Sequence, residues 1–575
     1  MRIKSIKIIF FILTLTMLSA SASVLSSKVN SLQTDLNKAH KAIEASVLQM
    51  RRLDYDSLSE IIKSVETNLT EAIRLMETND EDEAENLLKT ASASLALIEP
   101  MLYESLKIET RGMWVDNFTI DRFYSREDIA KHLDELKAIN VNIIFPDVYG
   151  NGAAIYPSKV VPQQKRFQTF FNGQDILKII IEEAHLREIE VHPLVRIFAL
   201  HNGAEHFIDD KLTWLDRTST GSFTLSNGYY WLCPGYPDVR EYNIAFLKEL
   251  ATNYDIDGIH LDYIRFDADF GYNAFVRELF KSFYGIDPVD IQSDRLKEIF
   301  TVFKAQFVNK FVERAFNEIK AINSKILVSA AVASPYSWGK KDLGQDWLNW
   351  VLNRHINFLT PMSYRSNVEQ YSSLVKSEIN TIEGKTYIYT GLGIYLYNDK
   401  VLGGQIQAGR DVKMSGQAVF STANMKPWHY EMLKNGPWRE PAIPTFRDPA
   451  YAAKALLEDS VQRLTEFGPL LPIEVTLLDE YIGLLQDFVT RLTSLSLRPW
   501  DSRDLRESNT SEFDQLSPLI DDLIAFSKRI NRDSVKDNLT PNLFANRLGN
   551  DIDCVRSLLE PLLYTATPYE YISSK

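Results

Sequence analysis

Cysteine is nearly absent from this 575-residue sequence, which has only Cys233 and Cys554, far apart in the chain. The two form no CxxC pair, so a zinc–thiolate site and a disulfide framework are excluded. The nine histidines form no HxH or HExxH pattern, and no GxSxG, GxGxxG or P-loop motif occurs. These absences argue against metal hydrolases, serine hydrolases and nucleotide-binding folds. We therefore expect neither a metal ion nor a cofactor.

An excess of basic residues is also missing. The chain has 63 Lys and Arg against 77 Asp and Glu, which gives a formal net charge of -14. Because nucleic-acid binding needs a basic surface, we expect no nucleic-acid partner. Hydrophobic residues make up 45% and charged residues 24%, which excludes a disordered chain and a multi-span membrane protein. Aromatic residues, at 11%, are the one excess, and sugar-binding sites often stack sugars on such rings.

The N-terminus has the pattern of a secretory signal peptide. Basic residues precede an apolar core from Ile8 to Leu18, and Ala20-Ser21-Ala22 follows as a cleavage sequence. The apolar core is too short to cross a bilayer comfortably. We predict a cleaved signal peptide over residues 1–22 and a secreted or periplasmic protein. The alternative is an uncleaved anchor, which would keep the same domain outside the membrane.

Two regions have helical patterns and flank a different central region. Apolar residues recur at intervals of three and four from Ile62 to Met76, which is typical of an amphipathic helix. We predict a helical hairpin or bundle over residues 23–107 and a second helical module over residues 448–575. These modules could bind a protein partner in the cell envelope, or they could serve only for packing and spacing.

The central region, residues 108–447, alternates short β-branched runs with amphipathic helical stretches. Eight such strand–helix units predict a (β/α)8 TIM barrel in the α/β class, with an open doubly wound sheet as the alternative. The candidate strands are Gly112–Val115, Val141–Phe145, Glu190–Val195, Gly258–Leu261, Ile326–Ala331, Asn357–Thr360, Thr386–Tyr389 and Gln417–Phe420.

The strongest chemical pattern follows the fourth candidate strand. Asp262, Tyr263 and Arg265 come together at its carboxyl end, which is the end where barrel enzymes carry their active sites. An arginine beside a carboxylate favours its ionised form, so we expect Asp262 to be an ionised nucleophile or a stabiliser of an oxocarbenium-like transition state. The alternative is a structural Asp–Arg pair that holds the loop.

Other strand ends supply further polar and aromatic groups. Asp346, next to Trp347, and Asp147, directly after the second strand, are the candidates for a second acid, although Asp346 could simply cap a helix. His192 is as often a core residue as a ligand. The expected substrate-binding residues are Tyr263, Arg265, His192, Arg196, Tyr149, Trp338, Tyr364 and Trp114.

Carboxylates and aromatic rings at one rim are typical of glycoside hydrolysis. The Asn-Glu pair that many barrel glycosidases carry after the fourth strand is missing, as is a second Glu after the seventh. Any glycosidase of this sequence must therefore use aspartates.

Several segments together resemble the glycosyl hydrolase-like 10 family of secreted bacterial TIM-barrel proteins. The resemblance runs from Arg111-Gly112-Met113-Trp114 to Glu440-Pro441-Ala442-Ile443-Pro444. It includes the segment from Cys233 to Arg240, the segment from Asp257 to Arg265, and the segment from Phe358 to Tyr364.

This resemblance implies a secreted hydrolase of O-glycosidic bonds that acts on an extracellular polysaccharide or cell-wall glycan. It also implies that Asp262 is the acid of the fourth strand and that Asp346 is a plausible second acid. The competing hypothesis is a catalytically inactive barrel that binds glycan or protein, with the helical modules as partner surfaces.

Overall fold

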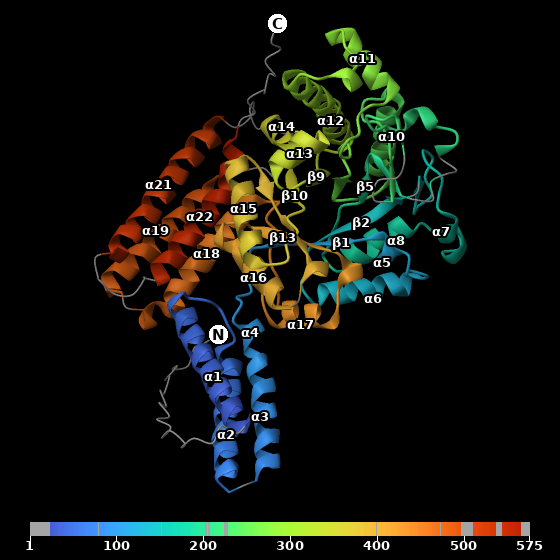
Figure 1. Cartoon of the computed structure of the whole chain (residues 1–575). Coiled ribbons are helices and arrows are strands. Elements are labelled where there is room, and N and C mark those ends of the chain that lie inside the picture. The colour runs from blue at the N-terminus through green and yellow to red at the C-terminus, as the bar shows by residue number, and fades with distance from the viewer. Residues whose placement is uncertain are drawn as a thin grey trace.

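The computed structural model describes residues 24–78, 80–150, 152–201, 204, 208–223, 228–397, 399–471, 473–495, 510–535 and 543–564. The predicted signal peptide lies outside the described residues. A central α/β unit has a group of long helices along one side, and three N-terminal helices project from it (Figure 1). Among the helices that the structure describes, none has the length and hydropathy needed to span a lipid bilayer.

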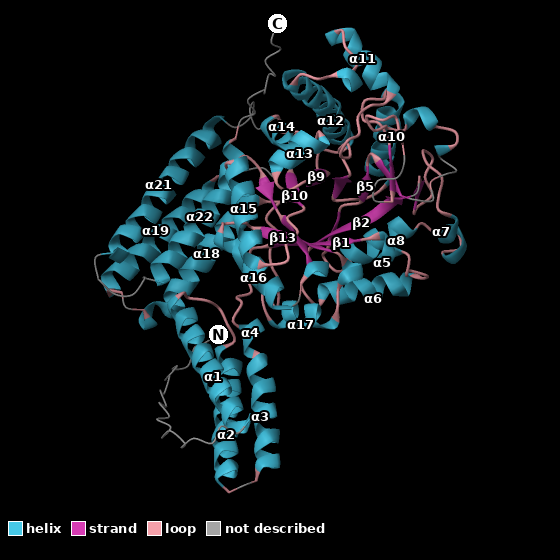
Figure 2. Ribbon diagram, in the orientation of Figure 1, coloured by secondary structure: helices cyan, strands magenta, loops and turns pink. Residues whose placement is uncertain are grey.

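The strands of the central unit form one parallel ring (Figure 2). Each of the eight consecutive strand positions pairs with the next, and β13 pairs with β1. The strands are β1 (Thr110–Val115), β2 (Ile143–Gly150), β4 (Glu190–Val191) with β5 (Leu194–Arg196), β8 (Gly258–Asp262), β9 (Leu327–Val332), β10 (Phe358–Pro361), β11 (Tyr387–Ile388) with β12 (Thr390–Gly393), and β13 (Gly416–Phe420).

The seventh strand position completes the ring, although it is divided into β11 and β12. β11 pairs with β10 and β12 pairs with β13, and only Tyr389 separates them. The backbone N–H of Tyr389 donates to the carbonyl of Leu359 at 2.9 Å, so the chain continues beside β10. The sheet therefore closes into a barrel, which confirms the predicted fold class and all eight predicted strands and excludes the open sheet.

Helices cover the outside of the barrel, and short strands lie in its loops. The helices are α5 (Asn117–Ile120), α6 (Arg126–Lys137), α7 (Lys165–Phe170), α8 (Ile176–His185), α10 (Pro237–Asn253), α11 (Ala274–Tyr284), α12 (Asp294–Ile322), α13 (Tyr336–Leu343), α14 (Trp347–Leu352), α15 (Val368–Ile382), α16 (Asp399–Asp411) and α17 (Pro427–Asn435). The short strands are β3 (Ala153–Ala154), β6 (Ala199–His201) and β7 (Tyr229–Trp231). Both faces of a barrel strand are covered, which is why β1 and β9 are buried along their whole length.

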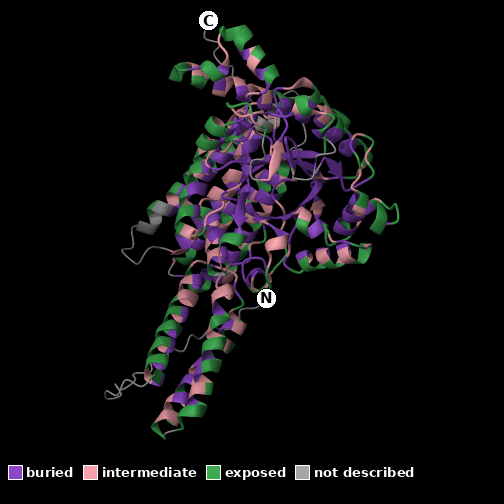
Figure 3. Ribbon diagram, turned by 45° about the vertical axis from the view of Figure 1, so that its right-hand side comes forward, coloured by how far each residue is buried: buried purple, intermediate pink, exposed green. Residues whose placement is uncertain are grey.

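The N-terminal helices α1 (Val24–Leu48), α2 (Tyr55–Glu77) and α3 (Glu81–Ala96) pack against one another, and the short α4 (Ile98–Met101) leads into the barrel. Their common core consists of one apolar stripe per helix, for example Leu58, Val65 and Ala72 on α2. Most of their remaining surface is exposed, as Figure 3 shows for the part that projects from the body.

The C-terminal helices are α18 (Pro449–Phe467), α19 (Val475–Ser494), α21 (Thr510–Val535) and α22 (Leu543–Leu563). Their apolar core is continuous with the interior of the barrel at its amino-terminal end, through Phe446 and Tyr387. The hydroxyl of Tyr387 donates to the carbonyl of Leu558 on α22 at 2.9 Å. These helices therefore cover the base of the barrel and leave its opposite, carboxyl end for a site.

Candidate active site

Asp262 lies at the carboxyl end of β8. Because side chains alternate along a strand, Gly258, His260 and Asp262 face the same side, the barrel interior. His260 is fully buried, accepts a hydrogen bond from Trp114 Nε1 at 3.2 Å, and lies 2.8 Å from Ser329 Oγ. Burial lowers the pKa of His260 well below its usual range, so its imidazole ring is neutral. Asp262 follows two residues later, nearer the carboxyl end of the barrel, and is half-buried.

Arg196 of β5 lies opposite Asp262 in the parallel register of β5 and β8. Its guanidinium forms a buried ion pair with Asp147 of β2, and Nη2 also donates to Asn117 Oδ1 at 3.1 Å. β2, β5 and β8 are neighbours in the barrel. Three adjacent strands thus carry a carboxylate, a guanidinium and a second carboxylate at their carboxyl ends.

The two carboxyl groups titrate in different surroundings. Burial raises the pKa of Asp262 to about 6; a hydrogen bond from the Tyr263 N–H and the charges of Arg196 and Arg265 oppose the rise, and the charge of Asp147 adds to it. Burial also raises the pKa of Asp147, against the opposing charge of its partner Arg196. Since a guanidinium stays charged in proteins, Asp147 faces a permanent cation.

Arg265 differs from the sequence-based expectation that it pairs with Asp262. Its Nη1 donates to Asp267 Oδ1 at 3.2 Å and to the Phe266 carbonyl at 3.0 Å. The guanidinium lies 4.7 Å from the ring centroid of Trp231. Arg265 therefore contacts Asp267 and Trp231. Of the two arginines, Arg196 has the larger effect on the pKa of Asp262.

An aromatic cluster borders Asp262 on one side. The ring of Tyr263 lies 4.9 Å from Tyr229 and 5.7 Å from Trp231, both on β7. Tyr263 has a φ of 48°, in the left-handed region that a bulky residue rarely adopts. Tyr229 and Trp231 are not among the binding residues predicted from the sequence, although the run of three aromatic residues from Tyr229 to Trp231 is a signal for such a site.

Tyr364 borders Asp262 from the loop after β10. Burial, and after it the negative charge of Asp262, raises the pKa of Tyr364 well above its usual range. Its ring packs on β12, where a Cβ at Gly391 would lie 2.7 Å from Tyr364 Cε1. Phe420 of β13 lies 5.5 Å from the Tyr364 ring and 6.0 Å from Trp114. Trp114 therefore belongs to the buried wall below the site, behind Phe420.

A small pocket of about 50 Å³ opens beside Asp147. One oxygen of Asp147, Oδ1, is buried without a hydrogen-bond partner. The pocket is lined by Asn117, Ile120, Asp121, Asp147, Gly150, Ile155, Gln164 and Arg196. All these residues come from the ends of β1, β2 and β5 or the loops that follow, so the pocket lies at the carboxyl rim.

Besides Trp114, two further predicted binding residues, His192 and Tyr149, do not line the rim. His192 is fully buried at the base of the barrel, 5.9 Å from Phe446, because it precedes Arg196 by four residues on the same face of the strand. Tyr149 is buried outside the barrel wall, where its hydroxyl lies 3.1 Å from that of Tyr242 on α10. The structure therefore corrects the expectation that these two side chains line the rim.

Asp346 and Trp338 lie in the loop region after β9. Asp346 is buried, accepts a hydrogen bond from the Tyr336 hydroxyl at 2.5 Å, and pairs with Lys340 at 3.2 Å. These contacts connect α13 to the start of α14. Asp346 is only 1% exposed and both of its carboxylate oxygens contact α13, so it connects the two helices and does not face the open rim. Trp338 is exposed on α13.

No metal site accompanies this arrangement in the part of the chain that the structure describes, since no three His, Cys, Asp or Glu side chains gather there to hold an ion.

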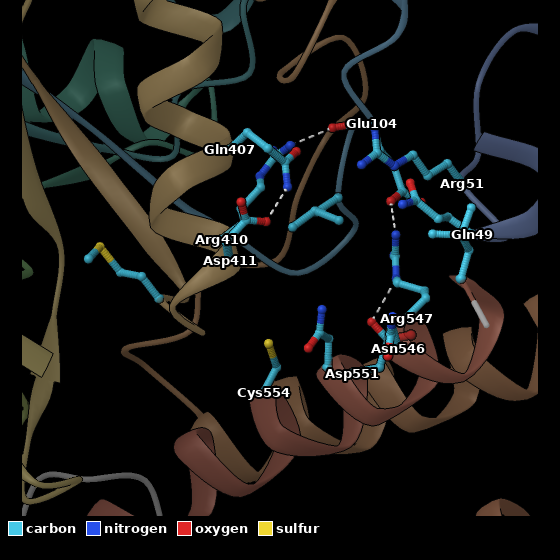
Figure 4. A pocket seen from close by; sticks show the side chains of 14 residues that line it. Gln49, Arg51, Glu104, Gln407, Arg410, Asp411, Asn546, Arg547, Asp551 and Cys554 are labelled. Atoms are coloured by element: carbon cyan, nitrogen blue, oxygen red, sulfur yellow. Dashed lines mark hydrogen bonds and ion pairs between the residues drawn. The ribbon is translucent and has the colours of Figure 1, made fainter. Parts of the chain in front are cut away.

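A second pocket, of about 180 Å³, lies at the junction of the N-terminal helices, the barrel base and α22 (Figure 4). Glu104 accepts hydrogen bonds from Arg547 Nη1 at 2.5 Å and from the Arg52 N–H at 3.0 Å, and its carbonyl accepts one from Arg410 at 2.7 Å. Burial raises the pKa of Asp551, another partner of Arg547, to about 7. This pocket is at the opposite end of the barrel from Asp262 and joins three parts of the chain.

Comparison with known proteins gives one family. Residues 109–402 match the sequence model of the glycosyl hydrolase-like 10 family. The glycosyl hydrolase YngK of Bacillus subtilis (strain 168) is 22% identical over 299 residues, which are 48% of this chain and 56% of YngK. The glycosyl hydrolase DigH of Escherichia coli (strain K12) is 23% identical over 159 residues, which are 26% of this chain and 36% of DigH. The matches thus span about half or less of these curated relatives.

The chain is also partly similar to solved structures. The glycoside hydrolase domain of PgaB (BpsB) from Bordetella bronchiseptica has a TM-score of 0.43 and 11% identity, over 58% of this chain and 100% of that domain. The α-L-fucosidase isoenzyme 2 of Paenibacillus thiaminolyticus has a TM-score of 0.44 and 17% identity, over 57% of this chain and 48% of the fucosidase.

Proposed function

Because this chain belongs to the glycosyl hydrolase-like 10 family, we propose that it is a glycoside hydrolase that cleaves O-glycosidic bonds of an extracellular or cell-wall glycan. The observation that carries this proposal is the Asp147–Arg196–Asp262 arrangement at the carboxyl end of the barrel. Barrel enzymes act at that end, and glycosidic cleavage requires two carboxyl groups in different protonation states.

The surroundings of the two carboxyl groups suggest their roles. Burial raises the pKa of Asp262 to about 6, and the residue is only half-buried, so its carboxyl group can bind and release a proton near neutral pH. Asp147 is ion-paired with Arg196, and its free oxygen lines a pocket. We assign the proton transfer to Asp262 and the stabilisation of the oxocarbenium-like transition state to ionised Asp147. This assignment replaces the sequence-based expectation that Asp262 is the ionised group, because burial raises its pKa to about 6.

The aromatic residues would hold the sugar. Tyr263 and Tyr364 lie on two sides of Asp262. On the side of Tyr263, the rings of Tyr229 and Trp231 enlarge the aromatic surface. The predicted signal peptide supports action outside the cytoplasm. The helical regions at both ends of the chain offer surface to a partner in the cell envelope.

Digestion of a glycan panel that includes purified cell-wall strands tests the activity, with wild type beside Asp262→Asn. We expect Asp262→Asn to lower turnover about a thousandfold without loss of the folded state, because it removes the proton-transfer group. Asp255→Asn, an exposed aspartate at the other end of β8, is the matched control and should act like wild type. Wild type that binds a glycan without cleaving it would instead support a glycan-binding protein.

Activated substrates separate the two roles. An aryl glycoside with a good leaving group needs little protonation, so Asp262→Asn should keep much more activity on it than on the natural glycan. Asp147→Asn should lose activity on both substrates, because each passes through a positively charged transition state. If Asp147→Asn instead keeps its activity on the aryl glycoside and Asp262→Asn loses it, Asp147 is the proton donor and Asp262 the stabilising carboxylate.

A further inference from the structure

Two aromatic side chains are exposed together at the carboxyl rim, beside the small pocket at Asp147. Tyr124 is 53% exposed and Phe170 is 47% exposed, and their rings lie 5.0 Å apart at an interplanar angle of 83°. The guanidinium of Arg166 lies 4.8 Å from the ring centroid of Tyr124 and 5.5 Å from that of Phe170. We call Tyr124, Arg166 and Phe170 the rim platform.

The rim platform belongs to the same two loops that form the pocket. Tyr124 lies in the loop after β1, between α5 and α6, and Phe170 ends α7 in the loop after β2. These loops also supply Asp121 and Gln164 to the lining of the pocket that holds Asp147. Figure 1 shows α5, α7 and the end of β2 on one side of the barrel.

Arg166 holds the rim platform against the pocket wall. Its Nη2 donates to the carbonyl of Phe123 at 3.3 Å, and its Nε lies 4.0 Å from Oδ1 of Asp121, a lining residue. On the same helix, Phe167 is fully buried and anchors α7 in the barrel core. These contacts hold Arg166 and α7 in place beside the two exposed rings.

The two partly exposed rings meet at nearly a right angle and form a corner. Such a corner fits the apolar C–H face of a pyranose, and the adjacent guanidinium can donate hydrogen bonds to its hydroxyl groups. A single sugar bound at Asp262 would not contact the rings of Tyr124 and Phe170. A chain of sugars that passes from Asp262 over Asp147 and its pocket would reach them.

We propose that the rim platform is a distal subsite for one sugar unit of a polymeric glycan whose cleaved bond lies at Asp262. This inference rests on the proposed glycoside hydrolase function and narrows the substrate class to oligosaccharides and polysaccharides of several units. Short saccharides contact only Asp262 and its neighbours, and long chains gain affinity from the rim platform.

The test compares chain lengths with the double variant Tyr124→Ala/Phe170→Ala of the full chain. Binding of chito-oligosaccharides, from the disaccharide to the octasaccharide, and of purified cell-wall glycan strands is measured by calorimetry in the Asp262→Asn background, so that no substrate is consumed. We expect the dissociation constant of the longest bound chain to rise about tenfold, and that of the shortest to stay unchanged. In the catalytically active background, KM for long chains should rise while kcat stays the same.

Tyr451→Ala is the matched control, because Tyr451 is also 53% exposed but lies on α18, in the helical module at the barrel base. It should leave all dissociation constants unchanged. An equal loss of affinity for short and long chains, or no loss for either, overturns the platform assignment while the proposed function stands. Wild type that neither binds nor cleaves any glycan of the panel used to test the proposed function overturns both.

Discussion

Arg196 and Asp262 occupy opposite positions in the parallel register of β5 and β8. Arg196 is also ion-paired with Asp147, so one buried cation acts on both carboxyl groups of the candidate site. Its loss should therefore change the titration of Asp262 more than the loss of any other neighbouring charge.

Arg196→Gln should raise the pKa of Asp262 above its value of about 6, because the cation that favours the ionised form is removed. If Asp262 acts in its protonated form, wild-type activity falls as pH rises through about 6, and the variant should fall at higher pH. The measurement is kcat against pH, together with carbon NMR titration of the Asp262 carboxyl group. Arg265→Ala should also move the decline of kcat to higher pH, but by less. A decline of kcat that moves to lower pH in the Arg196→Gln variant would contradict the assignment.

Gly391→Ala should disturb the border of the site formed by Tyr364. A Cβ at this position would lie 2.7 Å from Tyr364 Cε1 and 3.1 Å from the Pro361 carbonyl, and neither contact can relax without moving the ring or the strand. We expect a loss of about 1–3 kcal/mol in the free energy of unfolding and a raised KM. Gly483→Ala on α19, where a Cβ meets nothing within 4 Å, should be neutral or stabilising. An unchanged KM for Gly391→Ala would mean that Tyr364 does not contact substrate.

Glu378 of α15 should make stability depend on pH. Burial raises its pKa to about 7, although Ser334 and Ser363 donate hydrogen bonds to it and Arg365 lies nearby. Because this folded-state pKa is above the ordinary value of 4.5, its contribution is fully present below 4.5 and is lost as pH rises through 7.

Glu378→Gln keeps the size of the side chain and removes its charge. Above pH 7 it should therefore be more stable than wild type, by up to about 3 kcal/mol, and its stability should vary less between pH 4.5 and 7. Urea denaturation across this pH range, followed by near-ultraviolet circular dichroism, gives the comparison. Glu369→Gln, an exposed residue on the same helix, should follow the wild-type curve. Identical pH curves for Glu378→Gln and wild type would refute the raised pKa.

Glu104 and Arg547, 443 residues apart, form a buried ion pair that connects the segment between α4 and β1 to α22. Removal of one partner leaves the other charge buried, so Glu104→Gln should cost about 3–5 kcal/mol and loosen the C-terminal helices. Thermal unfolding of single and double variants measures the coupling between the two residues. The exposed pair Arg529–Glu480 is the control, and its loss should cost less than about 1 kcal/mol. A Glu104→Gln variant as stable as the control variant would show that this junction is not held by charge.

The order of strands and the position of Asp262 were accessible from the sequence, because both depend on local pattern. The β-branched runs identify the strands of a parallel sheet buried on both faces, and Asp262 follows such a run directly. Arg196, Asp147 and Tyr364 also lie in or just after predicted strands, where local pattern identifies them. Arg196 and His192 share one face of the third strand position, four residues apart, so local pattern does not distinguish them.

Only the tertiary structure decided which of these groups meet. The height of a residue in the barrel depends on the register between strands, so Arg196 reaches the rim while His192 is closed off at the base by Phe446. Arg265 pairs with Asp267, two residues away, and not with Asp262, and the aromatic residues of β7 come to the site from the loop after β5; both depend on how the loops at the rim fold. A local pattern predicts which face of an element a side chain occupies, but the charges of Arg196 and Asp147 that act on the pKa of Asp262 come from segments distant in the chain.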